Sequence, residues 1–269
     1  MLADLHTHTN ASDGQYSPCK LVSLAKQRGL DVLAITDHDT VNGLSEGMRT
    51  GNELGLTVIP GVELGAKEYR ALHILGYNIS SENHGLCTLC RKLVGGRDER
   101  KYRIIEFLKE KGVFIDLAEV EELAGGEVIS RPHFAQVMVK RGYVSSNREA
   151  FDRYLDTDEY QRIERFKADA PTCIQAIRDA GGKAALAHPY QLKLPDEELA
   201  GLVKKLTDCG LEAIECHYPR HSPQQSRFYQ ELARKNGLHI SGGSDFHGEQ
   251  VKPDIQLAAL ELELDWLLT

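Results

Sequence analysis

Short apolar runs and amphipathic stretches alternate along most of the chain. The run Val32-Leu33-Ala34-Ile35 is unbroken, which is typical of a parallel strand covered on both faces. We expect strands at residues 2–7, 32–35, 57–60, 73–79, 184–187, 211–216 and 238–241. Ser17-Pro18 is a typical helix start and Gly29 a typical stop. We expect helices at residues 17–29, 171–181, 196–209 and 222–237, and one that ends near residue 54. The alternation predicts an α/β fold.

The pattern changes over residues 80–167, where charged, helical segments replace the strand rhythm. We therefore expect a (β/α) TIM-like barrel domain made of residues 1–79 and 168–269, with about seven strands. Residues 80–167 would then be a helical insertion, or lid subdomain, after the fourth strand. An open doubly wound sheet is the alternative, but no Gly-rich nucleotide fingerprint follows the first strand.

Composition narrows the class of protein further. Of the 269 residues, 41% are apolar and 27% are charged, which is ordinary for a globular domain and excludes wholesale disorder. No apolar run reaches the roughly 18 residues of a membrane span, and the N-terminus lacks the features of a secretory signal. The net charge of -8 disfavours a broad electrostatic grip on nucleic acid. We expect a cytoplasmic protein without an obligate protein partner.

The six cysteines do not predict a disulfide scaffold. Cys87 and Cys90 form the only C-x-x-C, and no second pair completes a zinc site made of four thiolates. We expect free thiols in a reducing cytoplasm.

Histidine and acidic side chains gather at the carboxyl ends of the predicted strands. These ends are Asp4-Leu5-His6-Thr7-His8 with Asp13, Thr36-Asp37-His38, Gly61-Val62-Glu63, Ala187-His188-Pro189 and Gly243-Ser244-Asp245-Phe246-His247. In a parallel barrel the carboxyl ends of the strands meet at one mouth, where the active site lies. We therefore expect these side chains to come together.

The spacing of these residues favours metal binding. His6 and His8 are two residues apart, as are Asp245 and His247, so each pair points one way on a strand. Burying so many ionisable groups without cations would be very unfavourable. Imidazoles and carboxylates without thiolate suit Zn, Mn or Fe, and the candidates are too many for one tetrahedral ion. We expect two or three divalent metal ions.

Together these motifs resemble those of the PHP (polymerase and histidinol phosphatase) superfamily over nearly the whole chain. The length, the insertion and Arg131-Pro132-His133 are most similar to a bacterial group within it. That group contains phosphatases of 3′,5′-nucleoside bisphosphates and the 5′-to-3′ exoribonuclease RNase AM. The resemblance implies a distorted seven-stranded barrel, a trinuclear site and a metal-dependent phosphoesterase. Its substrate would be a nucleotide or a short single-stranded RNA.

The resemblance also implies a ligand set for each metal. The first ion would be held by His6, His8, Glu63 and Asp245, the second by Asp13, His38 and His247, and the third by Glu63, His73 and His188. Glu63 would bridge. His73 is the weakest member, because it opens a predicted strand instead of ending one. A structural strand histidine is the alternative for it.

Three more residues are implied to act beside the substrate. Arg131 presents a planar fork that suits phosphate oxygens, and the proline after it fixes the backbone before His133. An ordinary loop salt bridge is the alternative for Arg131. His221, in Tyr218-Pro219-Arg220-His221-Ser222, matches a family position near the substrate. His217 departs from the family pattern, and a surface or packing role is favoured.

The expected reaction is attack on phosphorus by a hydroxide that bridges two metals, with Arg131 neutralising the phosphate. One alternative is a C–N amidohydrolase, which often bridges its metals with a modified lysine where this chain offers Glu63. A phosphatase of small molecules like histidinol phosphate and a metal-stabilised binding module without turnover are further alternatives. Asp37 and Asp39 flank His38 and are candidates for orienting the ligands.

Overall fold

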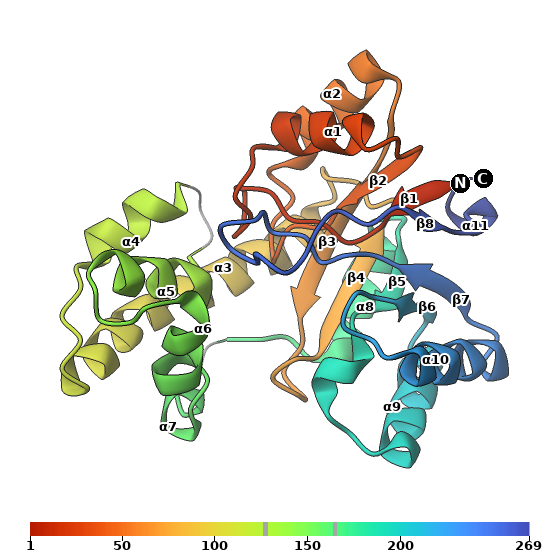
Figure 1. The fold of residues 1–269 in the computed structure, drawn as a ribbon. Helices are drawn as coiled ribbons and strands as arrows, with labels where there is room; N and C mark the ends of the chain where they lie inside the picture. Colours follow the sequence, from red (N-terminus) through yellow and green to blue (C-terminus); the bar gives the residue numbers. More distant parts are fainter. Residues whose placement is uncertain (126–128, 164–165, 269) are drawn as a thin grey trace.

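The computed structural model describes residues 1–125, 129–163 and 166–268, with the backbone alone at residues 97 and 98. One sheet runs through it in the order β7-β6-β5-β4-β3-β2-β1-β8. Its strands are β1 (Leu2–Asp4), β2 (Val32–Ile35), β3 (Thr57–Gly65), β4 (His73–Tyr77), β5 (Lys183–Leu186), β6 (Leu211–His217), β7 (His239–Gly242) and β8 (Leu260–Glu261). Figure 1 shows the sheet at the centre of the molecule, with helices around it.

Backbone hydrogen bonds bring the two sides of this sheet together. The Leu5 N–H donates to the Gly242 carbonyl over 3.1 Å, and the His8 N–H donates to the Phe246 carbonyl over 2.9 Å. The segments that continue β1 and β7 are therefore adjacent, and β1 to β7 form the predicted barrel. The short strand β8, which pairs antiparallel with β1, was not predicted because two residues carry no periodic signal.

The fourth strand differs from the parallel arrangement that the sequence predicted. β4 runs antiparallel to both β3 and β5. The connection between β3 and β4 spans only residues 66–72, whereas a parallel crossover needs about a dozen residues or more. β3 is also longer than expected, because its residues 57–60 pair with β2 and its residues 61–65 pair with β4. The first residue of β4, His73, consequently lies where the parallel strands end.

The long helices around the barrel agree with the predicted ones, whereas η2 and α11 were not predicted. They are α1 (Pro18–Gln27), α2 (Leu44–Leu54), α8 (Ala170–Asp179), the short η2 (Pro189–Leu192), α9 (Asp196–Asp208), α10 (Pro223–Lys235) and α11 (Asp265–Leu268). The Ser17 hydroxyl caps α1 by accepting from the Lys20 N–H, and Gly55 ends α2 at a positive φ of 63°. Every residue of β2 is buried, as its unbroken apolar run predicted.

Residues between β4 and β5 form a second group of helices, drawn beside the barrel in Figure 1. These are α3 (His84–Glu110), α4 (Leu117–Ala124), α5 (Arg131–Lys140), α6 (Asn147–Ala150), the π-helical η1 (Phe151–Leu155) and α7 (Asp158–Gln161). They enclose a hydrophobic core of their own around Phe134 and Tyr160. α3 joins both cores, because Leu86 packs in the barrel core and Leu108 in the second one. The division at residue 80 stays a prediction.

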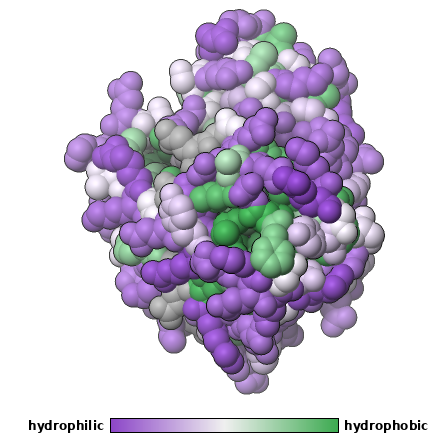
Figure 2. All heavy atoms as spheres, turned by 90° about the vertical axis from the view of Figure 1, so that its left-hand side faces the viewer, coloured by the Kyte–Doolittle hydropathy of each residue, from purple (hydrophilic) through white to green (hydrophobic). Residues whose placement is uncertain are grey.

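The surface is mostly hydrophilic where the second group of helices faces outward. Figure 2 shows polar side chains over most of this face and hydrophobic ones gathered near its centre.

None of the helices in the described part of the chain is long and apolar enough to cross a membrane.

Candidate metal centre

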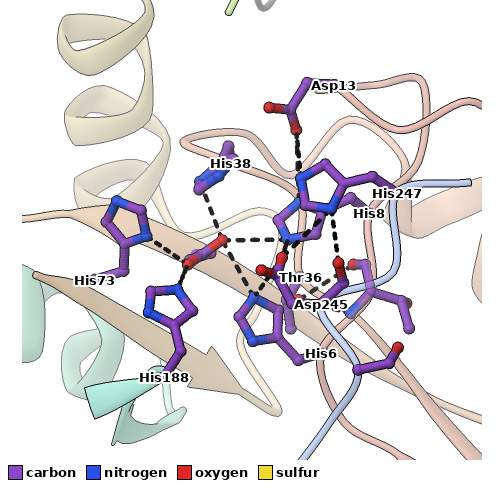
Figure 3. Close-up of polar contacts among 12 residues, drawn as sticks. His6, His8, Asp13, Thr36, His38, His73, His188, Asp245 and His247 are labelled. Carbon is purple, nitrogen blue, oxygen red and sulfur yellow. Dashed lines mark hydrogen bonds and ion pairs between the residues drawn. The ribbon is translucent and has the colours of Figure 1, made fainter. Parts of the chain in front are cut away.

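The predicted ligands meet in one cluster at the mouth of the barrel. Figure 3 shows the labelled histidine side chains turned toward a common space, with Asp13 and Asp245 at its side. They come from the segments after β1, β2, β5 and β7, from β3 and from the start of β4. The members are His6, His8, Asp13, His38, Glu63, His73, His188, Asp245 and His247. All of them are buried except His38 and His73, which are partly buried.

Glu63 stands at the centre of the cluster, and its side chain is fully buried. Its Oε2 atom lies near three imidazole nitrogens: His6 Nε2 at 3.3 Å, His8 Nε2 at 3.2 Å and His38 Nδ1 at 3.1 Å. Its Oε1 atom lies near two more: His73 Nδ1 at 2.7 Å and His188 Nε2 at 3.0 Å. This carboxylate faces five imidazoles, and the bridging role that the resemblance implied for Glu63 stays a prediction.

The direction of β4 explains how His73 enters this group. Gly65 of β3 pairs with His73, and Glu63 lies two residues earlier on β3, so its side chain points to the same face. Because β4 is antiparallel, its first residue and the last residues of its neighbours share one edge of the sheet. The opening position of His73 is therefore compatible with a place in the site.

Two aspartates lie beside His8 and His247 of the cluster. Asp245 Oδ1 lies 3.3 Å from His8 Nε2 and 3.3 Å from His247 Nδ1. Asp13 Oδ1 lies 3.3 Å from His247 Nε2. His8 and His247 therefore face carboxylates on more than one side.

Among the described residues, the potential ligand atoms form three groups. Within each group, these atoms all lie within 4.8 Å of one another. The groups are His6, His8, Glu63 and Asp245; His8, Asp13, His38 and His247; and His38, Glu63 and His73. The first is the set predicted for the first metal. The second adds His8 to its predicted set, and the third contains His38 in place of His188.

The donor set suits divalent transition metals. Several of its buried atoms have no hydrogen-bond partner within the described residues, namely His6 Nε2, His8 Nδ1 and Nε2, Asp13 Oδ1, His38 Nδ1 and Glu63 Oε2. Buried polar atoms normally have partners, and these all point toward one another. Imidazole nitrogen and carboxylate oxygen without thiolate are the ligands that Zn, Mn and Fe accept. The residues therefore fit a group of divalent ions.

The charges of the cluster lead to the same conclusion. Burial alone would lower the pKa of His6 and His8, but the carboxylates beside them outweigh burial. The pKa of His6 is held well above its usual value, and that of His8 is raised to about 9. Burial lowers the pKa of His73 to about 4. The carboxylates thus favour a positive charge at His6 and His8, and a metal ion bound to either ring would compete with its proton.

Glu215 contacts two residues of the cluster, His6 and His188, and was not predicted as a site residue. It is fully buried in β6, with Oε1 2.9 Å from His6 Nδ1. Its Oε2 accepts from the backbone N–H of His188 over 2.6 Å. A carboxylate on Nδ1 leaves Nε2 of His6 directed at the metal space. The signal in the sequence is an acidic residue inside the apolar run 211–216.

Asp37 supports the loop that carries Asp13. Its carboxylate accepts from the Thr9 N–H and from the Ser12 hydroxyl, over 2.7 and 2.6 Å. Asp39 supports β3 instead, since its own N–H donates to the Glu63 carbonyl over 2.9 Å. Both aspartates thus contact segments that carry predicted ligands, and their role in orienting the ligands stays a prediction.

The second oxygen of Asp245 has partners of its own. Lys252 Nζ lies 2.7 Å from Asp245 Oδ2, and the Tyr218 hydroxyl donates to the same oxygen over 3.1 Å. These two donors leave Oδ1 to face the histidines. Lys252 was not predicted, because it lies in an irregular segment without a periodic pattern.

The insertion touches the cluster through the start of α5. The Ser130 hydroxyl donates to Asp13 Oδ2 over 2.9 Å, and the Ser130 N–H donates to His133 Nδ1 over 3.2 Å. Arg131 follows on this segment. Its Nη1 lies 3.2 Å from Asp156 Oδ1, and its guanidinium covers the Phe151 ring at 5.3 Å. Arg131 thus makes the salt bridge that was its alternative, and a phosphate role for it stays a prediction.

His221 lies beside the cluster and in none of its three metal groups. Its Nδ1 is 3.1 Å from the Cys216 carbonyl, and its ring contacts the rings of Tyr190, Tyr218 and Tyr229. His217 ends β6, where its carbonyl accepts from the Gly243 N–H. The substrate role of His221 stays a prediction.

A barrel mouth filled with buried imidazoles and carboxylates is typical of metal-dependent hydrolases. The family described as PHP domain matches residues 4–159, more than half of the chain, and the chain belongs to this family. It is a metal-dependent phosphoesterase of the family, as the strand-end motifs predicted. The barrel class of the fold is confirmed as well.

Three curated relatives show the range of this similarity. A 5′-3′ exoribonuclease of Haemophilus influenzae is 34% identical, over 91% of this chain and 89% of its own. A phosphoribosyl 1,2-cyclic phosphate 1,2-diphosphodiesterase of Eggerthella lenta is 31% identical, over 93% and 95%. A 3′,5′-nucleoside bisphosphate phosphatase of Chromobacterium violaceum is 29% identical, over 91% and 86%. All three names describe hydrolysis of phosphate esters.

A solved structure described as an amidohydrolase from Chromobacterium violaceum, with bound sulfate and no metal, superposes with a TM-score of 0.90. It is 28% identical in sequence, and the match covers 98% of this chain and 92% of that one.

Proposed function

We propose that this phosphoesterase acts on nucleotides, either at the 5′ end of short single-stranded RNA or on 3′,5′-nucleoside bisphosphates. The observation that carries the proposal is the buried Glu63 carboxylate, which faces five imidazoles. The names of the curated relatives support nucleotides as the substrate class. In the proposed account, two or three ions of Mn, Fe or Zn complete the site.

Each ion has a proposed ligand set. The sets are His6, His8, Glu63 and Asp245 for the first ion; Asp13, His38 and His247 for the second; and Glu63, His73 and His188 for the third. When bound, divalent ions lower the pKa of water and neutralise phosphate oxygens. Glu215 and Asp37 hold the ligands in place, since preorganised ligands need no rearrangement during the reaction.

The insertion, residues 80–167, acts in this account as a lid that carries a phosphate-binding arginine. The Ser130–Asp13 hydrogen bond places the start of α5 at the cluster, and Arg131 is the next residue. A guanidinium has five donors, and the Arg131 side chain is 33% exposed, so the contact with Asp156 leaves donors for a phosphate. His133 fixes the backbone before Arg131 through its bond with the Ser130 N–H. His221 is the proposed third contact to substrate.

A substrate comparison tests the proposal. Metal-free protein, checked by elemental analysis, is reloaded with Mn, Fe or Zn in turn. Hydrolysis is then measured on a 5′-phosphorylated short RNA, a 3′,5′-bisphosphonucleoside, a 5′-mononucleotide, a ribose 1,2-cyclic phosphate and an amide. We expect metal-dependent turnover of one of the first two in preference to the other substrates.

The matched variants are His6→Gln, which removes a proposed ligand, and His84→Gln, which changes an exposed histidine at the start of α3. We expect turnover to be lost in the first variant and retained in the second. Preferred turnover of the cyclic phosphate or the amide would refute the proposed substrate class. Equal activity in both variants would refute the proposed site.

A further inference from the structure

A groove of about 750 Å³ lies beside the metal cluster, between the segment after β5 and helix α10. Ligand pockets usually have volumes of about 300–1,000 Å³, so the groove is large enough for a small organic group. Its aromatic lining consists of Tyr190, Phe228 and Tyr229. Tyr190 and Phe228 are partly exposed, whereas Tyr229 is buried beneath them.

A series of ring contacts links the lining of the groove to the metal cluster. The ring of the predicted ligand His188 lies 6.0 Å from that of Tyr218, measured between centroids. The Tyr218 ring lies 5.4 Å from that of Tyr190, which lines the groove. Tyr190 follows His188 by two residues, and Ser222 at the other wall follows β6. Both walls thus belong to segments that leave strands at the barrel mouth.

The charges and polar groups of the lining select the kind of ligand. Two exposed cations, Lys193 and Arg227, are balanced by two exposed carboxylates, Asp196 and Glu231. Balanced charges do not favour a run of phosphates, which needs a basic groove. The remaining polar lining is uncharged and consists of Ser222, Gln224 and Gln225. Half-exposed rings with neutral hydrogen-bonding groups suit a neutral heteroaromatic ring.

We propose that this groove binds a nucleobase of the substrate whose phosphate lies at the metal cluster. The proposal rests on the proposed function, because it deepens the substrate class of the same site. A base stacked on Tyr190 and Phe228 would lie two ring contacts from His188, by way of Tyr218. The groove would then make the enzyme selective for nucleotides over phosphate esters that have no base.

The test compares two substrates that differ only in whether they carry bases. One is a 5′-phosphorylated dinucleotide, and the other carries abasic ribose in place of both nucleosides. Base stacking on an aromatic side chain raises affinity by roughly 10-fold or more. We expect kcat/KM of the wild-type chain to favour the base-containing substrate by at least about 10-fold. Phe228→Ala should lower kcat/KM for the base-containing substrate and so remove most of this preference. Its kcat/KM for the abasic substrate should be nearly unchanged.

Two variants serve as controls. Phe228→Tyr keeps the ring and should keep the preference, which separates stacking from a fold defect. Phe114→Ala removes a phenylalanine that is 63% exposed in the insertion and should have no effect on the preference. A wild-type chain that hydrolyses both substrates equally, or a Phe228→Ala chain that keeps the full preference, would overturn the proposal.

Binding of adenosine, which has no phosphate, tests the groove independently of turnover. Equilibrium dialysis should show adenosine bound to the wild-type chain and to Phe228→Tyr, with at least about 10-fold weaker binding to Phe228→Ala. If the chain hydrolyses no nucleotide yet binds adenosine in this manner, the proposed function fails and the groove assignment stands. Absence of adenosine binding at millimolar concentration would overturn the groove assignment even in an active enzyme.

Discussion

Replacing Glu215 by glutamine is a sharp test of how the fold supports the metal site. The substitution keeps the size of the side chain but removes its charge and one acceptor. Glu215 uses both oxygens, one toward His6 Nδ1 at 2.9 Å and one toward the His188 N–H at 2.6 Å. A glutamine offers one oxygen, so one of these buried groups would face an amide N–H₂.

A buried donor left without an acceptor costs about 1–3 kcal/mol, or roughly 5- to 150-fold in an equilibrium constant. Loss of a carboxylate behind a metal-binding histidine typically costs about 10- to 100-fold in metal affinity or activity. We therefore expect Glu215→Gln to bind the first metal about 10- to 100-fold more weakly, with lower kcat/KM at limiting metal. Excess metal should restore part of the rate.

The assay is competition for metal with a chromophoric chelator, followed by turnover at low and high metal concentration. Glu212→Gln is the matched control on the same strand, because Glu212 is partly exposed and faces Lys183 at 3.6 Å. We expect this control to bind metal as the wild-type chain does. Wild-type metal affinity in Glu215→Gln would refute the idea that Glu215 orients His6 for the metal.

Other residues and properties give three further predictions. Arg131→Ala should leave metal content unchanged and lower kcat/KM by roughly 10²- to 10³-fold, and Arg131→Lys should recover only part of it; unchanged kinetics would reduce Arg131 to a structural partner of Asp156. Lys252→Met should lower kcat/KM roughly 10-fold by removing one of the two donors to Asp245 Oδ2, and a wild-type rate would contradict this. Metal binding at neutral pH should release protons, because the pKa values of His6 and His8 are raised and both therefore carry a proton there. The affinity for metal should accordingly rise as pH increases toward 9. Calorimetry in two buffers of different ionisation enthalpy measures the number of protons released. Identical heats of binding in both buffers would refute the predicted proton release.

Most of the fold could be predicted because its strands are buried and parallel. Such strands give unbroken apolar runs like Val32–Ile35, and helix ends such as Ser17-Pro18 and Gly55 follow from local chemistry. The direction of β4 was missed, although the shortness of the 66–72 connection already argues against a parallel crossover. The direction of this strand explains how His73, although it opens β4, lies beside Glu63.

The predicted ligands came together because they share strand ends, which is a property of the topology. Glu215 and Lys252 have no such common position. Glu215 lies within a strand, and Lys252 reaches Asp245 from an irregular segment seven residues later. Their contacts with the site depend on tertiary packing, and the acidic residue inside the run 211–216 is the one signal that the sequence offers for them. The salt bridge between Arg131 and Asp156 has the same origin, because it depends on how α5 and η1 pack.

The central claim is that Glu63 joins at least two metal ions in a catalytic site. The most direct measurement is the metal content of purified Glu63→Gln and wild-type protein, determined by elemental analysis beside their rates of phosphoester hydrolysis. Two or more divalent transition-metal ions per wild-type chain are predicted, with loss of metal and nearly all activity in Glu63→Gln. Wild-type metal content and rate in Glu63→Gln, or full activity in wild-type protein verified to be metal-free, would contradict the account.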